Sequence, residues 1–230
     1  MITFDNKPFS DFNTFEDESQ LYGTPSKDST FYSIPGKSGD LEIFNNRYLN
    51  KELSVNCFIR ENFGENYSNL INFLYSSDGY KRFETSVDPD VYRMASFVSE
   101  IEPDTGSFLK YGQFTLTFNF KPQKWLKMGE IGIDLSSSQT IFNPTNFTAL
   151  PLFEVVGTGT LNINSSTLVL ANNTSTTMID CEMQDCYEGV INRNPDLTIT
   201  GGFPSLKKGE NVISFTGFTS VKLIPRWWKL

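Results

Sequence analysis

The segment Gly112-Gln113-Phe114-Thr115-Leu116-Thr117-Phe118-Asn119-Phe120 decides the fold class of this chain. Apolar and polar residues alternate along it, and successive side chains of a strand point to opposite faces. Phe114, Leu116, Phe118 and Phe120 therefore share one face, while Thr115, Thr117 and Asn119 share the other. The pattern predicts a strand that is buried on one side.

The composition extends this prediction to the whole chain. Among 230 residues there are 21 Phe and 9 Tyr, and Asn, Ser and Thr fill much of the rest. Aromatic residues and Thr fit a pleated surface, while Asn and Ser favour turns. The length allows one large or two modest domains. We therefore expect a mainly β protein with two β-sandwich domains.

The domain boundary is expected where the alternation stops after Lys121. A stretch rich in Gly and Ser precedes Asn143-Pro144, so we predict a first domain at 1–128, a linker at 129–142 and a second domain at 143–230. Short strands separated by turn residues predict the second sandwich. These strands are expected at Leu152–Val156, Thr160–Ile163, Thr167–Leu170, Met178–Asp180, Cys186–Val190, Leu197–Thr200 and from Asn211 onward.

One helix is predicted in the first domain. Its apolar stripe has helical spacing and is typical of packing against a sheet; the stripe consists of Phe63, Tyr67, Leu70, Ile71 and Leu74. Gly79 is a candidate C-terminal cap for this helix.

Three turns are predicted from Gly, Pro and Asp. Residues 35–40 form a turn-rich loop after a strand at Thr30 to Ile34. Asp104-Thr105-Gly106 is expected to join two strands as a hairpin, and Gly157-Thr158-Gly159 is read as a second hairpin turn.

The charge balance argues against nucleic-acid binding. The net charge is −8, and residues 1–140 hold 13 basic and 20 acidic residues. Phosphate contacts require clustered Lys and Arg, which the sequence lacks. The acidic cluster Glu16-Asp17-Glu18 is expected in a solvated loop or at a sheet edge.

The absence of histidine removes several catalytic classes. With 0 His and 3 Cys, the chain has no Ser-His-Asp or Cys-His arrangement and no imidazole metal ligand. Cys181 and Cys186 allow a local disulfide, but the odd count favours three reduced thiols. Phosphate-binding, EF-hand and zinc spacings are also absent.

Carboxylates are the remaining catalytic option, because a glycosidase uses two of them. The candidates are Asp88, Asp90, Glu100 and Glu102. However, Asp88-Pro89-Asp90 is typical of a turn, and Glu100 and Glu102 are expected on the outward face of a strand. We assign no catalytic, cofactor-binding or metal-binding residue, expect no cofactor, and expect that the protein is not an enzyme.

A membrane role is not expected either. No apolar run approaches the ~20 residues that span a bilayer. The amino-terminal residues lack the basic and apolar regions of a signal peptide.

The end of the chain is aromatic. A strand with alternating residues from Val212 is followed by a second up to Pro225, and then by Arg226-Trp227-Trp228. We expect a closing strand of the second domain with at least one Trp buried and the other facing outward. Stacking of these side chains on a sugar is the alternative.

An ordered set of segments carries a family resemblance. It runs from Ile34-Pro35-Gly36-Lys37-Ser38-Gly39 through the helix 67–74, Asp88-Pro89-Asp90-Val91-Tyr92-Arg93-Met94-Ala95 and Gly112 to Pro122. It continues with Asn143-Pro144, Ile179-Asp180-Cys181-Glu182, Tyr187, and Phe203-Pro204-Ser205-Leu206-Lys207-Lys208-Gly209-Glu210-Asn211 through Trp228. Together these segments, which cover nearly the whole chain, resemble the distal tail proteins of siphophages that infect Gram-positive bacteria.

The resemblance implies an amino-terminal sandwich that forms a hexameric ring and a carboxy-terminal galectin-like sandwich. Such a ring joins the major tail tube protein to the tail-associated tip protein and to other baseplate or receptor-binding proteins. It implies a virion protein of the tail tip, made in the host cytoplasm, with DNA passing through the lumen without specific binding. An acidic lumen would repel that DNA. The alternative is a carbohydrate-binding module that recognises cell-wall glycans through the second sandwich.

Overall fold

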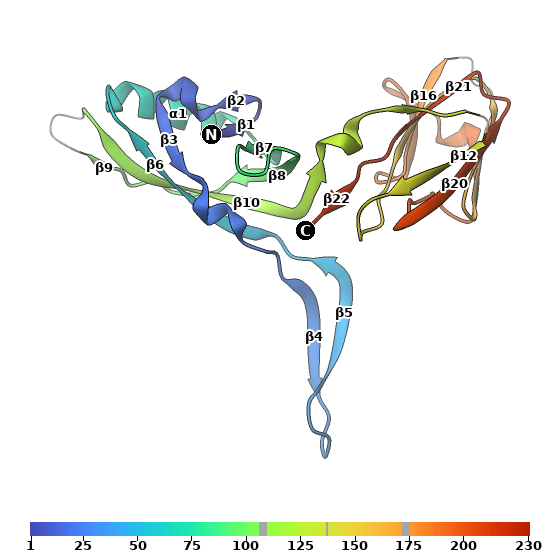
Figure 1. The fold of residues 1–230 in the computed structure, drawn as a ribbon, viewed down its shortest axis with the longest axis horizontal. Helices are drawn as coiled ribbons and strands as arrows, with labels where there is room; N and C mark the ends of the chain where they lie inside the picture. The colour runs from blue at the N-terminus through green and yellow to red at the C-terminus, as the bar shows by residue number, and fades with distance from the viewer. Residues whose placement is uncertain (106–109, 137, 172–174) are drawn as a thin grey trace. The chain divides into compact units, whose positions relative to one another are not determined.

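The computed structural model describes residues 1–105, 110–136, 138–171 and 175–230 and is mainly β (Figure 1). Strands hold 53% of the chain and helices 13%, which confirms the predicted fold class. The chain divides into two compact units, Met1–Lys124 with Leu230, and Trp125–Lys229.

The first unit is built on a nine-stranded sheet. Its main path has the order β2-β1-β7-β8-β10-β6-β3, and β9 and β22 pair with β10 off this path. The elements of this unit are β1 (Ile2–Phe4), β2 (Lys7–Pro8), η1 (Phe9–Phe12), β3 (Thr14–Asp17), η2 (Glu18–Tyr22), β4 (Lys27–Ser33), β5 (Asp40–Tyr48), β6 (Lys51–Ile59), α1 (Phe63–Ser76), β7 (Lys81–Thr85), β8 (Val91–Phe97), β9 (Asp104–Thr105) and β10 (Gly112–Leu126).

The nine-stranded sheet curls so that its distant strands β1 and β3 meet. The backbone N–H of Ile2 donates to Glu16, and the Met1 ammonium contacts Glu18 and lies 3.7 Å from Glu16. The two Glu side chains are only 6% and 7% exposed. Strand β3 is the last strand on the path of the sheet, so the expected sheet edge is confirmed for Glu16 and Asp17. The expected exposure to solvent is wrong for Glu16 and Glu18, because cationic and N–H partners hold both carboxylates inside the curl.

Helix α1 covers the apolar face of the curled sheet. Phe63, Leu70 and Leu74 are buried, as the helical stripe predicted. The helix starts after Asn62 and ends before Ser77, so Gly79 lies beyond the cap. The predicted alternation of β10 is also confirmed, since Phe114, Leu116, Phe118 and Phe120 are all buried.

Phe118 is the centre of the aromatic core. Its ring lies 5.2 Å from that of Phe4, 5.1 Å from that of Phe83 and 5.5 Å from that of Phe97. The two edge-to-face pairs among these three add to the burial of a large apolar area.

Asp104 and Thr105 were expected in a turn, and the structure places them in a strand. They belong to β9 and pair with Gln113 and Gly112 of β10. Gly106, the third residue of the expected turn, is outside the described residues.

Strands β4 and β5 form a hairpin, residues 27–48, that we call the arm. Figure 1 shows it as a ribbon extending from the nine-stranded sheet. Within the described residues, β4 and β5 pair only with each other. The predicted turn-rich loop is its tip, where Gly36 and Gly39 take positive φ angles of 81° and 84°, which glycine adopts at little cost.

The second unit contains two sheets with the orders β11-β21-β13-β16-β17-β18 and β12-β20-β14-β15-β19. Buried residues of both sheets form one core cluster, which is the packing of a sandwich. Its elements are η4 (Lys127–Glu130), β11 (Ile133–Asp134), β12 (Ser138–Asn143), β13 (Leu152–Val156), β14 (Gly159–Ile163), β15 (Ser166–Leu170), β16 (Thr176–Asp180), β17 (Asp185–Glu188), β18 (Ile191–Asn192), η5 (Asn194–Asp196), β19 (Leu197–Thr200), β20 (Gly209–Thr216), β21 (Ser220–Ile224) and β22 (Trp228–Lys229).

The Gly157-Thr158-Gly159 segment is not a hairpin turn. It joins β13 and β14, which belong to different sheets. Gly157 has φ +92°, and a Cβ at Gly159 would lie 2.3 Å from the Thr216 carbonyl oxygen. The two glycines thus allow the chain to cross between the layers where the backbones approach closely.

Residues 129–142, predicted as a linker, contain part of η4 together with β11 and most of β12. They fall within the second unit, which begins at Trp125. Strand β11 pairs with β21, and β12 with β20. Residue 137 is outside the described residues.

Replacing the central core aromatic tests this packing. Phe118→Ala should lower the free energy of unfolding by about 3–5 kcal/mol, because it removes a fully buried ring and leaves a cavity. Urea denaturation followed by fluorescence measures this loss. Phe31→Ala, on the arm at a ring that is 61% exposed, is the control and should change it by less than about 0.5 kcal/mol. Equal effects of the two variants would contradict the assigned core.

Candidate assembly surfaces

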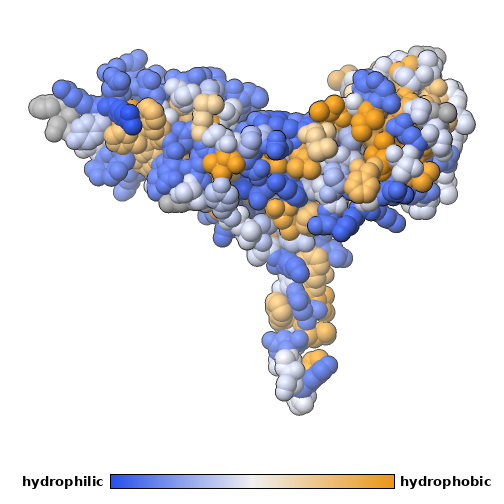
Figure 2. All heavy atoms as spheres, viewed as in Figure 1, coloured by the Kyte–Doolittle hydropathy of each residue, from blue (hydrophilic) through white to orange (hydrophobic). Residues whose placement is uncertain are grey.

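The arm carries an apolar face with no cover among the described residues. Cross-strand pairing places Thr30 opposite Ile43 and Tyr32 opposite Leu41, and directly opposed side chains lie on the same side of a ribbon. These four residues are the arm face. Tyr32, Leu41 and Ile43 are 53%, 50% and 47% exposed, and Figure 2 shows apolar residues along this ribbon.

The other side of the arm is more polar. Phe31 lies opposite Glu42, and Ser33 opposite Asp40. The Ser29 hydroxyl donates to Glu42 at 2.7 Å. Nearer the base, Asp28 accepts from Arg47 at 2.5 Å. Phe44 lies on the same side, opposite Ser29. Both sides of the arm therefore hold aromatic residues, and the carboxylates of Asp40 and Glu42 belong to this side alone.

The uncovered side of the β6–β10 pair forms a second surface, the polar face. It is made of Glu52, Ser54, Asn56, Thr115, Thr117 and Asn119, which oppose one another in register. The hydroxyls of Ser54 and Thr117 lie 2.9 Å apart, and the Thr115 hydroxyl donates to Asn56 at 2.9 Å. These cross-strand hydrogen bonds make a hydroxyl- and amide-rich sheet surface.

A shallow depression of about 790 Å³ lies at one end of the polar face. Its lining is acidic, with Asp17, Glu100, Glu102 and Asp104 near Arg60. Glu100 and Glu102 follow the end of β8 and are not in a strand, which corrects their predicted position. In the described part of the chain, no group of three or more potential ligands could hold a metal ion.

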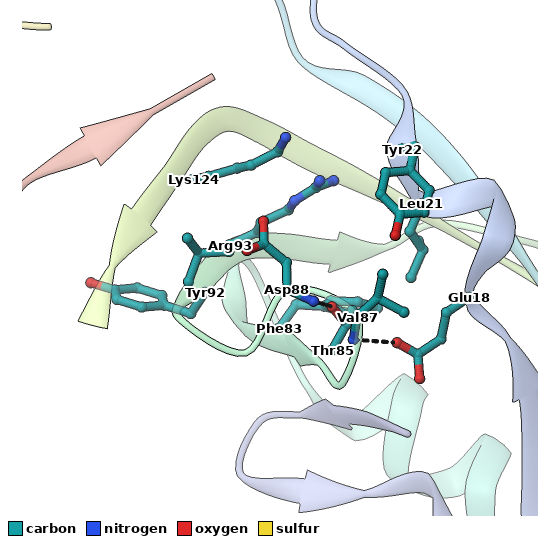
Figure 3. A pocket seen from close by; sticks show the side chains of 11 residues that line it. Glu18, Leu21, Tyr22, Phe83, Thr85, Val87, Asp88, Tyr92, Arg93 and Lys124 are labelled. Atoms are coloured by element: carbon teal, nitrogen blue, oxygen red, sulfur yellow. Dashed lines mark hydrogen bonds between the residues drawn. The ribbon is translucent and has the colours of Figure 1, made fainter. Parts of the chain in front are cut away.

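The structure does not bring the four candidate catalytic carboxylates together. Asp88 and Asp90 lie in the turn between β7 and β8, as predicted. Asp88 lines a different cavity from Glu100 and Glu102. A glycosidase needs its two carboxyl groups on either side of one bond. Because Asp88 lies in a different cavity, which Figure 3 shows, it cannot form such a pair with Glu100 or Glu102.

The three cysteines are free and buried. A disulfide between Cys181 and Cys186 is therefore absent. Burial raises the pKa of Cys181 to about 12 and that of Cys186 to about 11, and it also raises the pKa of Cys57. Such thiols react slowly, because the thiolate is the reactive form.

Arg226, which was a candidate for sugar stacking, forms an ion pair instead. Its guanidinium donates two hydrogen bonds to Asp180, both at 2.8 Å. Asp180 also accepts from the backbone N–H groups of Glu182 and Met183. Burial would raise the pKa of Asp180, but these hydrogen bonds and the charge of Arg226 outweigh it and leave the pKa lowered.

The prediction that at least one of the two terminal tryptophans is buried is confirmed, because Trp227 is only 3% exposed. Trp228 is only partly exposed, since its ring stacks on Phe147 at 4.3 Å and its Nε1–H donates to the Thr148 carbonyl at 2.9 Å. The second tryptophan therefore packs within its own unit. No local pattern in the sequence indicates Phe147 as its partner.

No helix in the described residues is both long and apolar enough to cross a membrane. No protein-family model and no curated protein sequence matches the chain. Comparison with solved structures, in contrast, gives matches over almost the full length.

The Dit protein of phage SPP1 has a similar fold, with a TM-score of 0.73, 15% identity, and coverage of 100% of this chain and 98% of that one. Its structure is described as a paradigm of the hub adsorption apparatus in phages that infect Gram-positive bacteria. Chains of the phage P2 baseplate in its activated conformation also match. With Ca the TM-score is 0.53, the identity 10%, and the coverage 92% of this chain and 89% of that one. With Sr the TM-score is 0.51, the identity 9%, and the coverage 96% of this chain and 89% of that one.

The chain therefore has the fold of phage tail hub and baseplate proteins. The likeness to Dit extends over both units, so the two-part architecture is shared and not only one domain of it.

The Arg226–Asp180 pair gives a stability prediction. Asp180→Asn should lower the free energy of unfolding at pH 7 by about 3 kcal/mol, because it removes one partner of a buried ion pair. This value is at the low end of the losses for such pairs, since the Arg226 side chain is 22% exposed. Glu154→Gln is the matched control, since Glu154 and Lys222 lie 3.9 Å apart and both are partly exposed. That change should cost less than about 1 kcal/mol.

The same pair predicts a dependence on pH. Because the folded-state pKa of Asp180 is lowered, its contribution is fully present above the unfolded-state pKa of about 3.9. It is lost as the pH falls through the folded-state value. Denaturation from pH 7 to pH 2 should therefore show a smaller acid-induced loss for Asp180→Asn than for the wild type; parallel curves would contradict the assignment.

Proposed function

We propose that this chain is a structural protein of a siphophage tail, a distal tail protein that acts as the baseplate hub. The observation that carries the proposal is the full-length likeness to SPP1 Dit, at a TM-score of 0.73. The match covers 100% of this chain and so includes both units, and the proposal does not depend on one common β-sandwich. In this role the protein is not an enzyme and needs no cofactor.

The proposed assembly is a ring of six copies formed by the first unit. The arm supports it, because an isolated two-stranded hairpin is marginally stable in water and the arm face is about half exposed. A neighbouring copy would cover that face. A contact between two different surfaces of identical chains repeats from copy to copy and closes into a ring when the rotation permits.

The proposed lumen is lined by the polar face. This face is rich in hydroxyl and amide groups, and the adjoining depression carries Asp17, Glu100, Glu102 and Asp104. Carboxylates repel the phosphates of passing DNA, so the DNA would move through without binding. A ring structure with a basic lumen would overturn this part of the proposal.

The proposed partners follow from the hub role. One side of the ring would bind the major tail tube protein, and the other the tail-associated tip protein, with other baseplate or receptor-binding proteins as further contacts. The protein would be made in the host cytoplasm and act at the tail tip of the virion. We propose the second unit as the galectin-like domain.

The carbohydrate-binding alternative loses its main candidates at the chain end. Trp227 is buried, Trp228 is stacked on Phe147, and Arg226 is paired with Asp180. Reaching a sugar with these side chains would require breaking contacts within the second unit.

The ring is tested by changing the arm face. Leu41→Asp should shift the purified protein from a hexamer towards the monomer, because it places a charge in the contact that covers the arm. Multi-angle light scattering across protein concentrations measures the mass. Val190→Asp is the control, at an exposed residue of the second unit, and should leave the mass unchanged. A hexamer that tolerates Leu41→Asp would contradict the role of the arm.

A further inference from the structure

The connection between α1 and β7 holds the one Asp-Gly dipeptide of the sequence, Asp78-Gly79, and the sequence has no Asn-Gly. In an Asp-Gly pair the Gly nitrogen can attack the side-chain carboxyl carbon of the Asp, because no Cβ on the glycine hinders the approach. Ring closure gives a succinimide, which water reopens to aspartate or to isoaspartate. A folded protein permits this route where the carboxyl group and the backbone are free to meet.

Asp78 and Gly79 have this freedom. Both residues are exposed and line an open depression of about 510 Å³, so water reaches them. Among the described residues, the Asp78 carboxylate has no hydrogen-bond or ion-pair partner, and the Gly79 N–H has no acceptor. An added Cβ at Gly79 would meet nothing within 4 Å, and the φ angle of this glycine is +72°, which glycine adopts at little cost. Neither packing nor hydrogen bonding therefore holds the pair.

The next most permissive dipeptides are held by hydrogen bonds. Serine after Asp or Asn also allows ring closure, and Asp28-Ser29 and Asn164-Ser165 are such pairs. The Asp28 carboxylate accepts from Arg47 at 2.5 Å, and the Asn164 amide donates to Asn211 at 2.9 Å. Each attacked group must leave its partner before the ring can close. The structure, and not the dipeptide alone, thus singles out Asp78-Gly79.

Both flanks of the Asp78-Gly79 pair are anchored. On one side the Ser77 hydroxyl donates to the Phe73 carbonyl at 3.2 Å. On the other side the Tyr80 hydroxyl accepts from Asn50 at 2.5 Å. An isoaspartate routes the main chain through the side-chain carboxyl carbon and so adds one carbon atom to the backbone between these anchors. The added length has to displace one of them, and the stability of the α1–β7 connection falls.

We propose that Asp78 is a site of spontaneous isomerisation to isoaspartate in the folded protein, and that the product loosens the α1–β7 connection. In the first step the Gly79 nitrogen bonds to the Asp78 Cγ, the Cγ–OH bond breaks, and the hydroxyl leaves with the amide proton as water. In the second step water adds to the Asp78 backbone carbonyl carbon, and the bond of that carbon to the Gly79 nitrogen breaks. The reaction needs no oxidant, reductant or enzyme, and the proposal does not depend on the tail function.

Ageing of the purified full chain tests the site. Isoaspartate is measured in each peptide of a digest by electron-transfer dissociation, which gives it a diagnostic fragment, for native protein and for protein kept in urea. The urea sample gives the rates that the sequence alone sets. Folding should slow the reaction at Asp28 and Asn164 at least ten-fold and at Asp78 less than three-fold. Equal slowing at all three residues would overturn the proposal.

Two substitutions at Asp78 check the route. Asp78→Glu keeps the charge but would need a six-membered ring, so isomerised product at this position should fall at least ten-fold. Asp78→Asn goes through the same succinimide with ammonia as the leaving group, and its ring should close faster than that of the wild type. A signal that persists in Asp78→Glu, or an Asn variant that reacts no faster, would contradict the cyclisation.

Thermal denaturation of the same samples tests the consequence. Aged wild-type protein should unfold at a lower temperature than fresh protein, in proportion to its isoaspartate content at Asp78. Asp78→Glu aged in parallel is the control and should keep its melting temperature. An unchanged melting temperature in isomerised wild-type protein would overturn the claim that the product loosens the α1–β7 connection.

Discussion

Burial of the apolar face of β10 is the interaction on which the first unit depends. Phe114, Leu116, Phe118 and Phe120 all face the core, where α1 and the curled sheet enclose them. Since side chains alternate in a strand, the same burial directs Thr115, Thr117 and Asn119 to the opposite side. The core and the polar face are thus two consequences of one alternating segment, and the surface proposed to meet DNA is fixed by the packing of the core.

Much of this was predictable because the physical signals are local. The alternation of β10, the stripe of α1 and the turn at Asp88-Pro89-Asp90 each lie within a few residues, and all three are confirmed. The hairpin predicted at Gly157-Thr158-Gly159 is wrong, because a hairpin and a passage between sheets use the same residue types. Only the pairing partners of β13 and β14, which lie far away in sequence, distinguish the two.

The surfaces were harder to predict than the core. Tyr32 and Leu41 have the apolar character of core residues, and nothing in their sequence says that the arm leaves the sheet. Conversely, Glu16 and Glu18 have the character of solvated residues but are buried, because their partners are the amino end of the chain and the β7–β8 turn. Exposure depends on tertiary partners that a local pattern does not contain.

The proposed ring, in which a neighbouring copy covers the arm face and the polar face lines the lumen, has one direct test. Electron microscopy of the purified full chain at high concentration should give class averages with six-fold symmetry and a central channel lined by the β6–β10 polar face. Isolated monomers, or a two-fold dimer in which identical surfaces meet, would contradict it.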